Sequence, residues 1–377
     1  MKVLHLDGVN EDFGGVLSVL RNLSSASAGP GWRHVVWVNE KYLERRQPPL
    51  DYRRSPHSVS DSPSHLRILF QAFRAYGDLK RLLAAETFDV VHAHSRGAML
   101  VAMLLASLAG RRVIFTNHNY ARNRALYRRV AKMKGVWTVL LTPNMSRYYG
   151  IPVDPPHISI ISSCYADKFL NEPLVVRSGD SVAKRPVRLV GVGTILRWKN
   201  WHLIAEAMSR LTGEDLALVQ FTLVGPTPDS PESRQYEREL RELIRRHQLE
   251  TRFILRGPAG SVVDELRQAD WMVHPSSNEP CGLALLEAMA VGLPVITSRS
   301  GGPVDFVQPE RTGVFFEPDD ADSLAVQLRR ILSRQIHPLP PAEIRETVRD
   351  RSASGVWPQY EKLYRRLVDT DCLSNDT

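Results

Sequence analysis

The feature that most constrains the fold of this chain is a repeated alternation of short β-branched runs with helical stretches. In the first half the runs lie at Val3–Leu6, His34–Val38, Val90–His94, Val113–Thr116, Thr138–Leu141 and Ile158–Ile161. A second series lies at Val187–Val192, Leu218–Val224, Phe253–Arg256, Trp271–Val273 and Val295–Thr297. Runs of this kind are typical of parallel strands buried under helices. The sequence therefore predicts an α/β fold with two Rossmann-like, doubly wound parallel sheets.

The length of the chain supports two domains. A chain of 377 residues exceeds one ordinary core. We place an N-terminal domain at 1–172 and a C-terminal domain at 187–354, with a polar linker between them and a final segment, 355–377, that rejoins the first domain. Because parallel sheets bind ligands at the carboxyl ends of their strands, we expect a cleft where two such edges face each other.

The composition indicates a globular protein of a reducing compartment. Hydrophobic residues make up 43% and charged residues 24% of the chain, so disorder is not expected. The three cysteines, Cys164, Cys281 and Cys372, are scattered and do not suggest disulfides or a metal site. The N-terminus lacks a signal-peptide pattern, and the longest apolar stretch, Gly97–Gly110, is too short to span a bilayer. We therefore expect a cytoplasmic protein.

The formal net charge of +8 is unevenly spread, since six basic residues crowd the segment Arg122–Lys134. Its apolar positions recur at helical spacing, which gives one apolar face. Two interpretations follow: a surface helix packed on the first domain, or peripheral contact with an anionic membrane. Nucleic acid is disfavoured as a partner, because no zinc-finger spacing or RNA-recognition signature accompanies these charges.

The most informative segment contains two glutamates, Glu279 and Glu287, on either side of a glycine that opens a helix. The helix after Gly282 is apolar all round, so we expect it to be buried. Its first residues, Cys281 to Leu283, offer backbone N–H groups to a phosphate, and a carboxylate can accept from two ribose hydroxyls. The spacing suits a nucleotide-sugar laid along a helix start. The alternative is a buried Glu287 paired with a lysine and a solvated Glu279.

This segment resembles the retaining family 4 glycosyltransferases, whose two-domain architecture is called GT-B. The two-glutamate spacing is that family's signature, and Ser300-Gly301-Gly302-Pro303 is similar to its Gly-Gly turn. The resemblance is strongest from about residue 188 to 317. It implies a nucleotide-sugar donor, with UDP favoured over GDP, an acceptor that the sequence does not identify, retention of anomeric configuration by front-face attack, and no metal or other cofactor.

A second candidate element is the strand end Gly193-Thr194 followed by Arg197 and Lys199. Two cations at a strand end can clamp a diphosphate. The family pattern is Gly-Arg, four residues, then Lys. Lys199 matches its lysine, Thr194 stands where arginine is expected, and Arg197 is a candidate replacement. The alternative is a pair of exposed cations at a helix start.

In the first half, Gly14-Gly15 directly follows the first strand and allows close backbone approach to a ligand. The resemblance places this turn beside the donor phosphates and the acceptor. It also places His118 near the reacting sugar, with His94 and His92 less favoured. A histidine at a strand end is otherwise more often structural.

Further strand ends in the second half complete the expected donor site. Gly225 ends one strand, and Arg256-Gly257 ends another. The resemblance implies that such ends flank the nucleotide base.

Three other activities stay open on the same residues. A nucleotide-sugar epimerase and a sugar phosphorylase share the architecture, and the departure at Thr194 keeps open a catalytically silent nucleotide-sugar-binding protein. A metal site is not expected, because the two Asp-x-Asp strings, at 320–322 and 369–371, suit a helix cap and a solvated tail.

Overall fold

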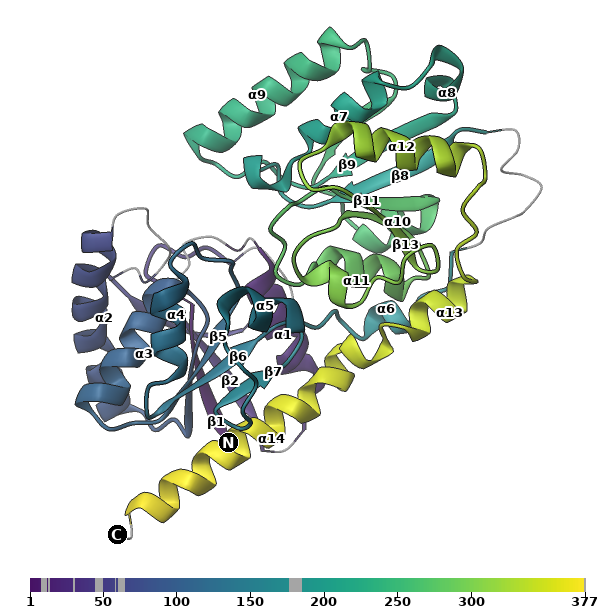
Figure 1. Cartoon of the computed structure of the whole chain (residues 1–377). Helices are drawn as coiled ribbons and strands as arrows, with labels where there is room; N and C mark the ends of the chain where they lie inside the picture. Colours follow the sequence, from purple (N-terminus) through teal and green to yellow (C-terminus); the bar gives the residue numbers. More distant parts are fainter. Residues whose placement is uncertain are drawn as a thin grey trace. The chain divides into compact units, whose positions relative to one another are not determined.

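A computed structural model describes residues 1–7, 12, 14–29, 31–44, 50–57, 59, 65–175 and 185–375. The chain divides into two compact units (Figure 1). Unit 1 comprises Met1–Tyr165 and Ala353–Thr377, and unit 2 comprises Ala166–Ser352. Part of the expected linker, 176–184, lies outside the described residues.

Unit 1 is built on a seven-stranded parallel sheet in the order β3-β2-β1-β4-β5-β6-β7. Its strands are β1 Lys2–Leu6, β2 Arg33–Asn39, β3 Asp51–Ser55, β4 Val90–Ala93, β5 Val113–Asn117, β6 Val136–Leu140 and β7 Ile158–Ile160. Its helices are α1 Gly15–Ala26, α2 His65–Ala85, α3 Arg96–Leu108, α4 Arg124–Ala131, α5 Pro143–Tyr149 and α14 Ala353–Asn375. Helices flank the sheet, which makes the unit doubly wound (Figure 1).

Unit 2 is built on a six-stranded parallel sheet in the order β10-β9-β8-β11-β12-β13. Its strands are β8 Val187–Val192, β9 Val219–Val224, β10 Phe253–Gly257, β11 Trp271–His274, β12 Val295–Ser298 and β13 Gly313–Phe316. Its helices are α6 Lys168–Asn171, α7 His202–Ser209, α8 Gly213–Ala217, α9 Pro231–Arg246, α10 Val262–Gln268, α11 Leu283–Ala290, α12 Ala321–Leu332 and α13 Pro341–Glu346, with 3-10 turns η2 Arg197–Lys199, η3 Gly302–Asp305 and η4 Arg349–Arg351. The predicted fold class, two Rossmann-like parallel sheets, is confirmed.

The order of the strands gives each unit one switch point. In unit 1 it lies between β1 and β4, since Leu6 is paired with Trp37 on one side and with Ala93 on the other. In unit 2 it lies between β8 and β11, where Leu189 pairs with both Phe221 and Trp271. Chain connections leave the sheet in opposite directions at a switch point, and ligands of open α/β sheets bind above the carboxyl ends of the two strands that flank it.

Two strands fall where the sequence patterns did not predict them. β3, at Asp51–Ser55, lies outside the β-branched runs from which the strands of the first half were predicted. Its sequence, DYRRS, has no apolar alternation because it is an edge strand paired only with β2. β13, with sequence GVFF, is a short buried run at the other sheet's edge.

The apolar stretch Gly97–Gly110 lies mostly in α3, which is a core helix. Gly97, Ala98, Met99, Val101, Ala102 and Leu105 are buried along it. None of the helices within the described residues has both the length and the hydropathy needed to cross a membrane.

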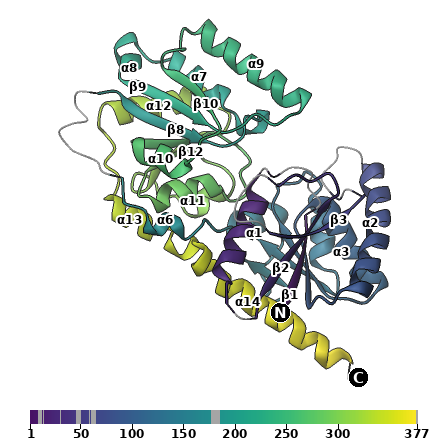
Figure 2. The same ribbon diagram turned by 180° about the vertical axis from the view of Figure 1, so that it is seen from behind.

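The last helix, α14, belongs to unit 1, where it packs against α1 (Figure 2). Two of its tyrosines, Tyr360 and Tyr364, are buried against the sheet. The hydroxyl of Tyr364 lies 2.9 Å from Nδ1 of His92 on β4. This buried hydrogen bond joins the end of the chain to the centre of the first sheet.

We predict that Tyr364→Phe lowers the free energy of unfolding of the protein by about 1–3 kcal/mol, because it leaves a buried nitrogen of His92 without its partner. Chemical denaturation checks this. Tyr76→Phe, at a half-buried tyrosine of α2, is the matched control and should change stability by less than about 0.5 kcal/mol. Equal effects of the two substitutions would contradict a stabilising role for the hydrogen bond between Tyr364 and His92.

Candidate functional site

The carboxyl end of β8 and the carboxyl end of β11, which flank the switch point of unit 2, carry two loops that are bonded to each other. Nδ2 of Asn200 donates to Oγ of Ser277 at 2.8 Å. Oγ of Ser276 donates to the backbone oxygen of Trp198 at 3.3 Å. Asn200 has the left-handed backbone conformation, with φ of 58°, which turns the first loop into α7. The two loops therefore form one structure at the place where a parallel sheet binds its ligand.

A buried ion pair lies at the centre of these loops. Nζ of Lys199 lies 2.6 Å from Oε2 of Glu279, and Nε2 of His274 lies 3.0 Å from the same oxygen. The side chains of Lys199 and Glu279 are only 13% and 11% exposed. The structure thus brings together two residues that the sequence singled out separately, together with His274, which it did not.

The electrostatics of the pair keep Glu279 ionised. Burial by itself would raise the pKa of Glu279, but the charge of Lys199 and the hydrogen bonds from His274 and Lys199 outweigh it and hold that pKa well below its ordinary value. Burial also lowers the pKa of His274, although Glu279 opposes this shift. A neutral His274 donates from Nε2 to the carboxylate, so the negative charge is held by one cation and one neutral donor.

The helix after this loop begins where the sequence predicted. Gly282 precedes α11 in the left-handed region, with φ of 85° and ψ of 61°, a conformation that favours glycine. The Gly301-Gly302 turn lies against the loop: a Cβ on Gly301 would lie 2.4 Å from the backbone oxygen of Glu279, and N–H of Gly302 donates to that oxygen at 2.8 Å. The double glycine is therefore required for the close approach that holds Glu279 in place.

The other predicted residues of this segment lie along the helix start. Cys281 is buried, while Leu283 and Glu287 are half-buried on α11. Glu287 lies within two helical turns of the first N–H groups of α11. Those N–H groups have no acceptor within the helix.

The glycines at neighbouring strand ends bring backbone close to backbone. Gly193 and Gly225 have φ values of 155° and 153°, and a Cβ on Gly225 would lie 2.0 Å from the backbone oxygen of Gly193. N–H of Gly225 donates to the backbone oxygen of Gly257 at 2.9 Å. The fully buried Trp201 donates from Nε1 to the backbone oxygen of Thr194 at 2.9 Å. These contacts set the path of the β8, β9 and β10 ends.

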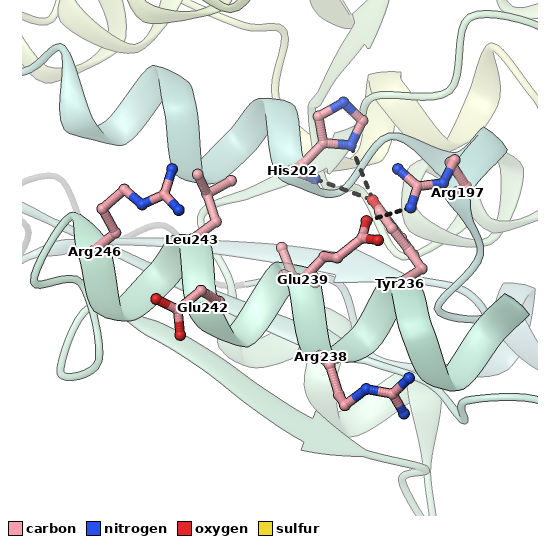
Figure 3. A pocket seen from close by; sticks show the side chains of 9 residues that line it. Arg197, His202, Tyr236, Arg238, Glu239, Glu242, Leu243 and Arg246 are labelled. Atoms are coloured by element: carbon pink, nitrogen blue, oxygen red, sulfur yellow. Dashed lines mark hydrogen bonds and ion pairs between the residues drawn. The ribbon is translucent and has the colours of Figure 1, made fainter. Parts of the chain in front are cut away.

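The structure gives Arg197 different partners from Lys199. Its guanidinium forms an ion pair with Glu239 of α9 and lies 5.0 Å from the centre of the Tyr236 ring. It lines an open pocket of about 560 Å³ between α9 and the start of α7 (Figure 3). Arg256, the other predicted arginine, pairs with Glu265 at 3.0 Å.

In unit 1, the predicted glycine turn and histidine lie at the carboxyl edge of the sheet. Gly14 precedes α1 with φ of 94°. Asp12, two residues before it, forms a buried, bidentate ion pair with Arg21 of α1, with both distances 2.8 Å. His118 follows β5, and its Nε2 lies 3.1 Å from Nδ1 of His94.

Several of these residues escaped the sequence analysis for identifiable reasons. Asp12 and Arg21 are nine positions apart, and nothing in their spacing indicates a pair. His274 had a usable signal, since it ends a buried strand and is followed by a loop of small polar residues. Asn200 gave none, because its left-handed conformation is visible only in the backbone.

We predict that Lys199→Ala destabilises the protein by about 3–5 kcal/mol at neutral pH, because it leaves the buried Glu279 carboxylate without its cation. In the wild type the lowered pKa of Glu279 contributes stability above its unfolded pKa of about 4.3, which is lost as the pH falls. In the variant burial dominates and raises that pKa, so stability is lost as the pH rises. The difference in free energy of unfolding should therefore grow between pH 4 and pH 7.

The matched control is Lys199→Ala combined with Glu279→Gln, which removes the unpaired charge. It should recover part of the lost stability and show little pH dependence of the remaining difference. A Lys199→Ala difference that is the same at pH 4 and pH 7 would contradict this account of the pair.

Each unit of the chain matches a glycosyltransferase family. The family described as Glycosyl transferases group 1 matches residues 179–350, and the family described as Glycosyltransferase Family 4 matches residues 13–148. The chain is 29% identical over 178 residues to the sulfoquinovosyl transferase SQD2 of Arabidopsis thaliana, a match that covers 45% of this chain and 31% of that protein. It is 26% identical over 290 residues to the UDP-Gal:alpha-D-GlcNAc-diphosphoundecaprenol alpha-1,3-galactosyltransferase of Escherichia coli, covering 71% and 72%.

Several of these relatives are longer than the matched part: the chain spans between about a third and a half of the length of the first curated relatives that it matches. Among solved structures, the fold is similar to a sucrose-phosphate synthase from Thermosynechococcus elongatus, with a TM-score of 0.79, 21% identity, and coverage of 98% of this chain and 100% of that one. Both family matches and the fold similarity follow the two units described above. The chain therefore belongs to the family 4 glycosyltransferases of the GT-B architecture.

Proposed function

We propose that this protein transfers a sugar from a UDP-linked donor to a glycan, lipid or small-molecule acceptor, with retention of anomeric configuration and without a metal ion. The observation that carries the proposal is the Lys199–Glu279 pair, held beside the start of α11 at the switch point of unit 2. A cation, a carboxylate and a helix start at one switch point suit a diphosphate with a sugar attached.

Each part of the donor would have its own binding residues in unit 2. The helix start at Gly282 and Leu283 and the ammonium group of Lys199 would receive the diphosphate. Glu287, further along α11, would accept from the ribose hydroxyls, and Glu279 would accept from hydroxyls of the sugar. The strand ends at Gly225 and at Arg256-Gly257 would flank the base. The UDP-Gal in the name of the galactosyltransferase relative supports UDP as the nucleotide.

The ion pair between Lys199 and Glu279 is compatible with the site both without and with a bound donor. An ammonium group has three N–H donors, so Lys199 can keep Glu279 as a partner while it donates to a phosphate oxygen. As the sugar leaves the diphosphate, negative charge grows on the phosphate, and Lys199 and the helix start would stabilise it. In front-face attack the departing phosphate takes the acceptor proton, so no separate base is required. Arg197 would add a further cation only if it left Glu239.

The proposal has three rivals that use the same site. An epimerase would convert the donor sugar without any acceptor, and a phosphorylase would require inorganic phosphate and a disaccharide. A catalytically silent binding protein would bind the donor without turnover, and threonine at position 194 in place of the expected arginine favours it most. Assays with the donor alone, with phosphate and a disaccharide, and with an acceptor panel separate these three.

We predict that Lys199→Ala and Glu287→Ala each lower kcat/KM for the donor by about 100-fold, because each removes a charge that binds the donor or the departing phosphate. The measurements that check this are donor turnover and the binding of the UDP-sugar, which is monitored by thermal shift. Arg246→Ala, on the exposed face of α9, is the matched control and should retain wild-type turnover. Wild-type turnover in both site variants would contradict the assigned roles.

We further propose that unit 1 contacts an anionic membrane through the basic segment around α4. All six cations of the segment are exposed: Arg122, Arg124, Arg128, Arg129, Lys132 and Lys134. Within the described part of the chain none of them has a carboxylate partner. Tyr127, Val130 and Ala131 are buried, so one side of the helix is packed on the unit while its cations are exposed. A membrane-facing unit would suit a lipid-linked acceptor, such as the one named for the galactosyltransferase relative.

We predict that the protein floats with liposomes that contain anionic lipid and stays behind with neutral liposomes. Arg128→Glu combined with Arg129→Glu should lower the bound fraction at least tenfold, since each cation contributes about 1 kcal/mol near such a surface. The control is Arg245→Glu combined with Arg246→Glu, at the exposed end of α9. Equal and negligible flotation with both kinds of liposome would remove the membrane proposal.

A further inference from the structure

Four histidine rings of unit 1 form a continuous hydrogen-bonded chain that ends at His118. We call His34, His5, His94 and His118 the histidine chain. Nδ1 of His34 lies 2.9 Å from Nε2 of His5, and Nδ1 of His5 lies 2.9 Å from Nε2 of His94. Nδ1 of His94 lies 3.1 Å from Nε2 of His118. Every link therefore joins Nδ1 of one ring to Nε2 of the next.

The strand order of the sheet makes this chain possible. His34 lies on β2, His5 on β1 and His94 directly after β4, which are neighbours in the sheet, and His118 follows β5. The first three side chains are at most 5% exposed. Burial lowers the pKa of His34 and of His118 to about 4, and it lowers that of His5 and of His94 well below the ordinary value. The rings are therefore neutral at neutral pH.

Neutral rings allow only two arrangements of protons. Each ring carries one N–H group and one lone pair, and each link needs one donor and one acceptor. Because all links run from Nδ1 to Nε2, the protonated nitrogen must be the same one in every ring. Either all four rings are protonated on Nδ1, or all four are protonated on Nε2.

The far end of the chain distinguishes these two arrangements. Nε2 of His34 lies 3.0 Å from Oγ of Ser27. Oγ of Ser27 also lies 3.0 Å from the backbone oxygen of Ser24, which can only accept, so the arrangement that satisfies both contacts has Ser27 donating to Ser24 and accepting from His34. His34 must then donate from Nε2, and the other three rings follow. Nδ1 of His118 is left with a lone pair, and no described residue donates a hydrogen bond to it.

We propose that Ser27 acts through the histidine chain to fix His118 as the Nε2-protonated tautomer, so that Nδ1 accepts a hydrogen bond from the ligand of unit 1. Ser27, His34, His5 and His94 are thus positioning residues, and they select a ligand group that carries a proton. The choice of a sugar hydroxyl as that group rests on the proposed function. The opposite tautomer would present an N–H group and favour a phosphate or a carbonyl oxygen instead.

The neighbouring His92 is not part of the chain. Its Nδ1 lies 2.9 Å from the hydroxyl of Tyr364, and its Nε2 lies 2.7 Å from Oγ1 of Thr116. Nitrogens of His5, His92 and His94 lie close enough together to suggest a metal site. Every ring nitrogen of these three residues already has a hydrogen-bond partner, however, so a metal ion would have to break the chain.

Nitrogen NMR of protein labelled with 15N-histidine tests the tautomer directly and needs no substrate. His118 is assigned by the signals that His118→Gln removes. We expect the wild type to show His118 protonated on Nε2 and unprotonated on Nδ1. Ser27→Ala removes the acceptor at the far end, so at least half of the His118 population should move to the Nδ1-protonated form.

Thr116→Val is the matched control, because it also removes a buried hydroxyl that is bonded to a histidine, but outside the chain. It should leave the tautomer of His118 unchanged. His34→Leu, which cuts the chain, is a second variant and should shift the tautomer as Ser27→Ala does. His118 protonated on Nδ1 in the wild type, or unchanged in both chain variants, would overturn the proposal.

The functional consequence is separate from the NMR result. If His118 accepts from a sugar hydroxyl, Ser27→Ala should lower the apparent affinity for the sugar-bearing ligand of unit 1 at least about twofold, since no more than half of the molecules keep the competent tautomer. The expected tautomer in a protein that transfers no sugar would refute the proposed function and leave this inference standing. The wrong tautomer in an active enzyme would do the reverse.

Discussion

The buried contact between Lys199 and Glu279 is the interaction on which the donor end of the structure depends. A carboxylate that is about one-tenth exposed is stable only with a cation and a hydrogen-bond donor beside it, and Lys199 and His274 supply them. To bring them together, the loops after β8 and β11 must meet. The switch point places these loops side by side. The Gly301-Gly302 turn packs closely against the backbone of Glu279 in the second loop.

Unit 1 stabilises its buried histidines by hydrogen bonds between neutral side chains. The sheet order of unit 1 joins neutral side chains into one hydrogen-bonded series that runs from Ser27, at the end of α1, to His118, which follows β5. The rings of His34, His5 and His94 are buried, and both nitrogens of each have a partner, so these rings are stabilised without a charge. In unit 2 an ion pair lies at the centre of the candidate site, whereas in unit 1 a series of neutral rings ends at His118.

Part of this site could be predicted because its chemistry is local in sequence. Glu279, Gly282 and Glu287 lie within one loop and one helix, so their spacing along the chain is nearly their spacing in space. Lys199 was identified for the same reason, because it follows the end of β8 closely in the sequence. Arg197, only two positions away, shows the limit: nothing in the sequence indicates that Glu239, on α9, is its partner.

The sequence by itself determined the two parallel sheets, the helix opened by Gly282, and the family to which the chain belongs, because buried strands and turn glycines leave periodic and local signals. The tertiary structure alone decided that Lys199 pairs with Glu279, that Asp12 pairs with Arg21, and that four histidines form a chain. These contacts join residues that lie between nine and eighty-nine positions apart. Such pairs depend on strand order and on loop geometry, which hydrophobic periodicity does not encode.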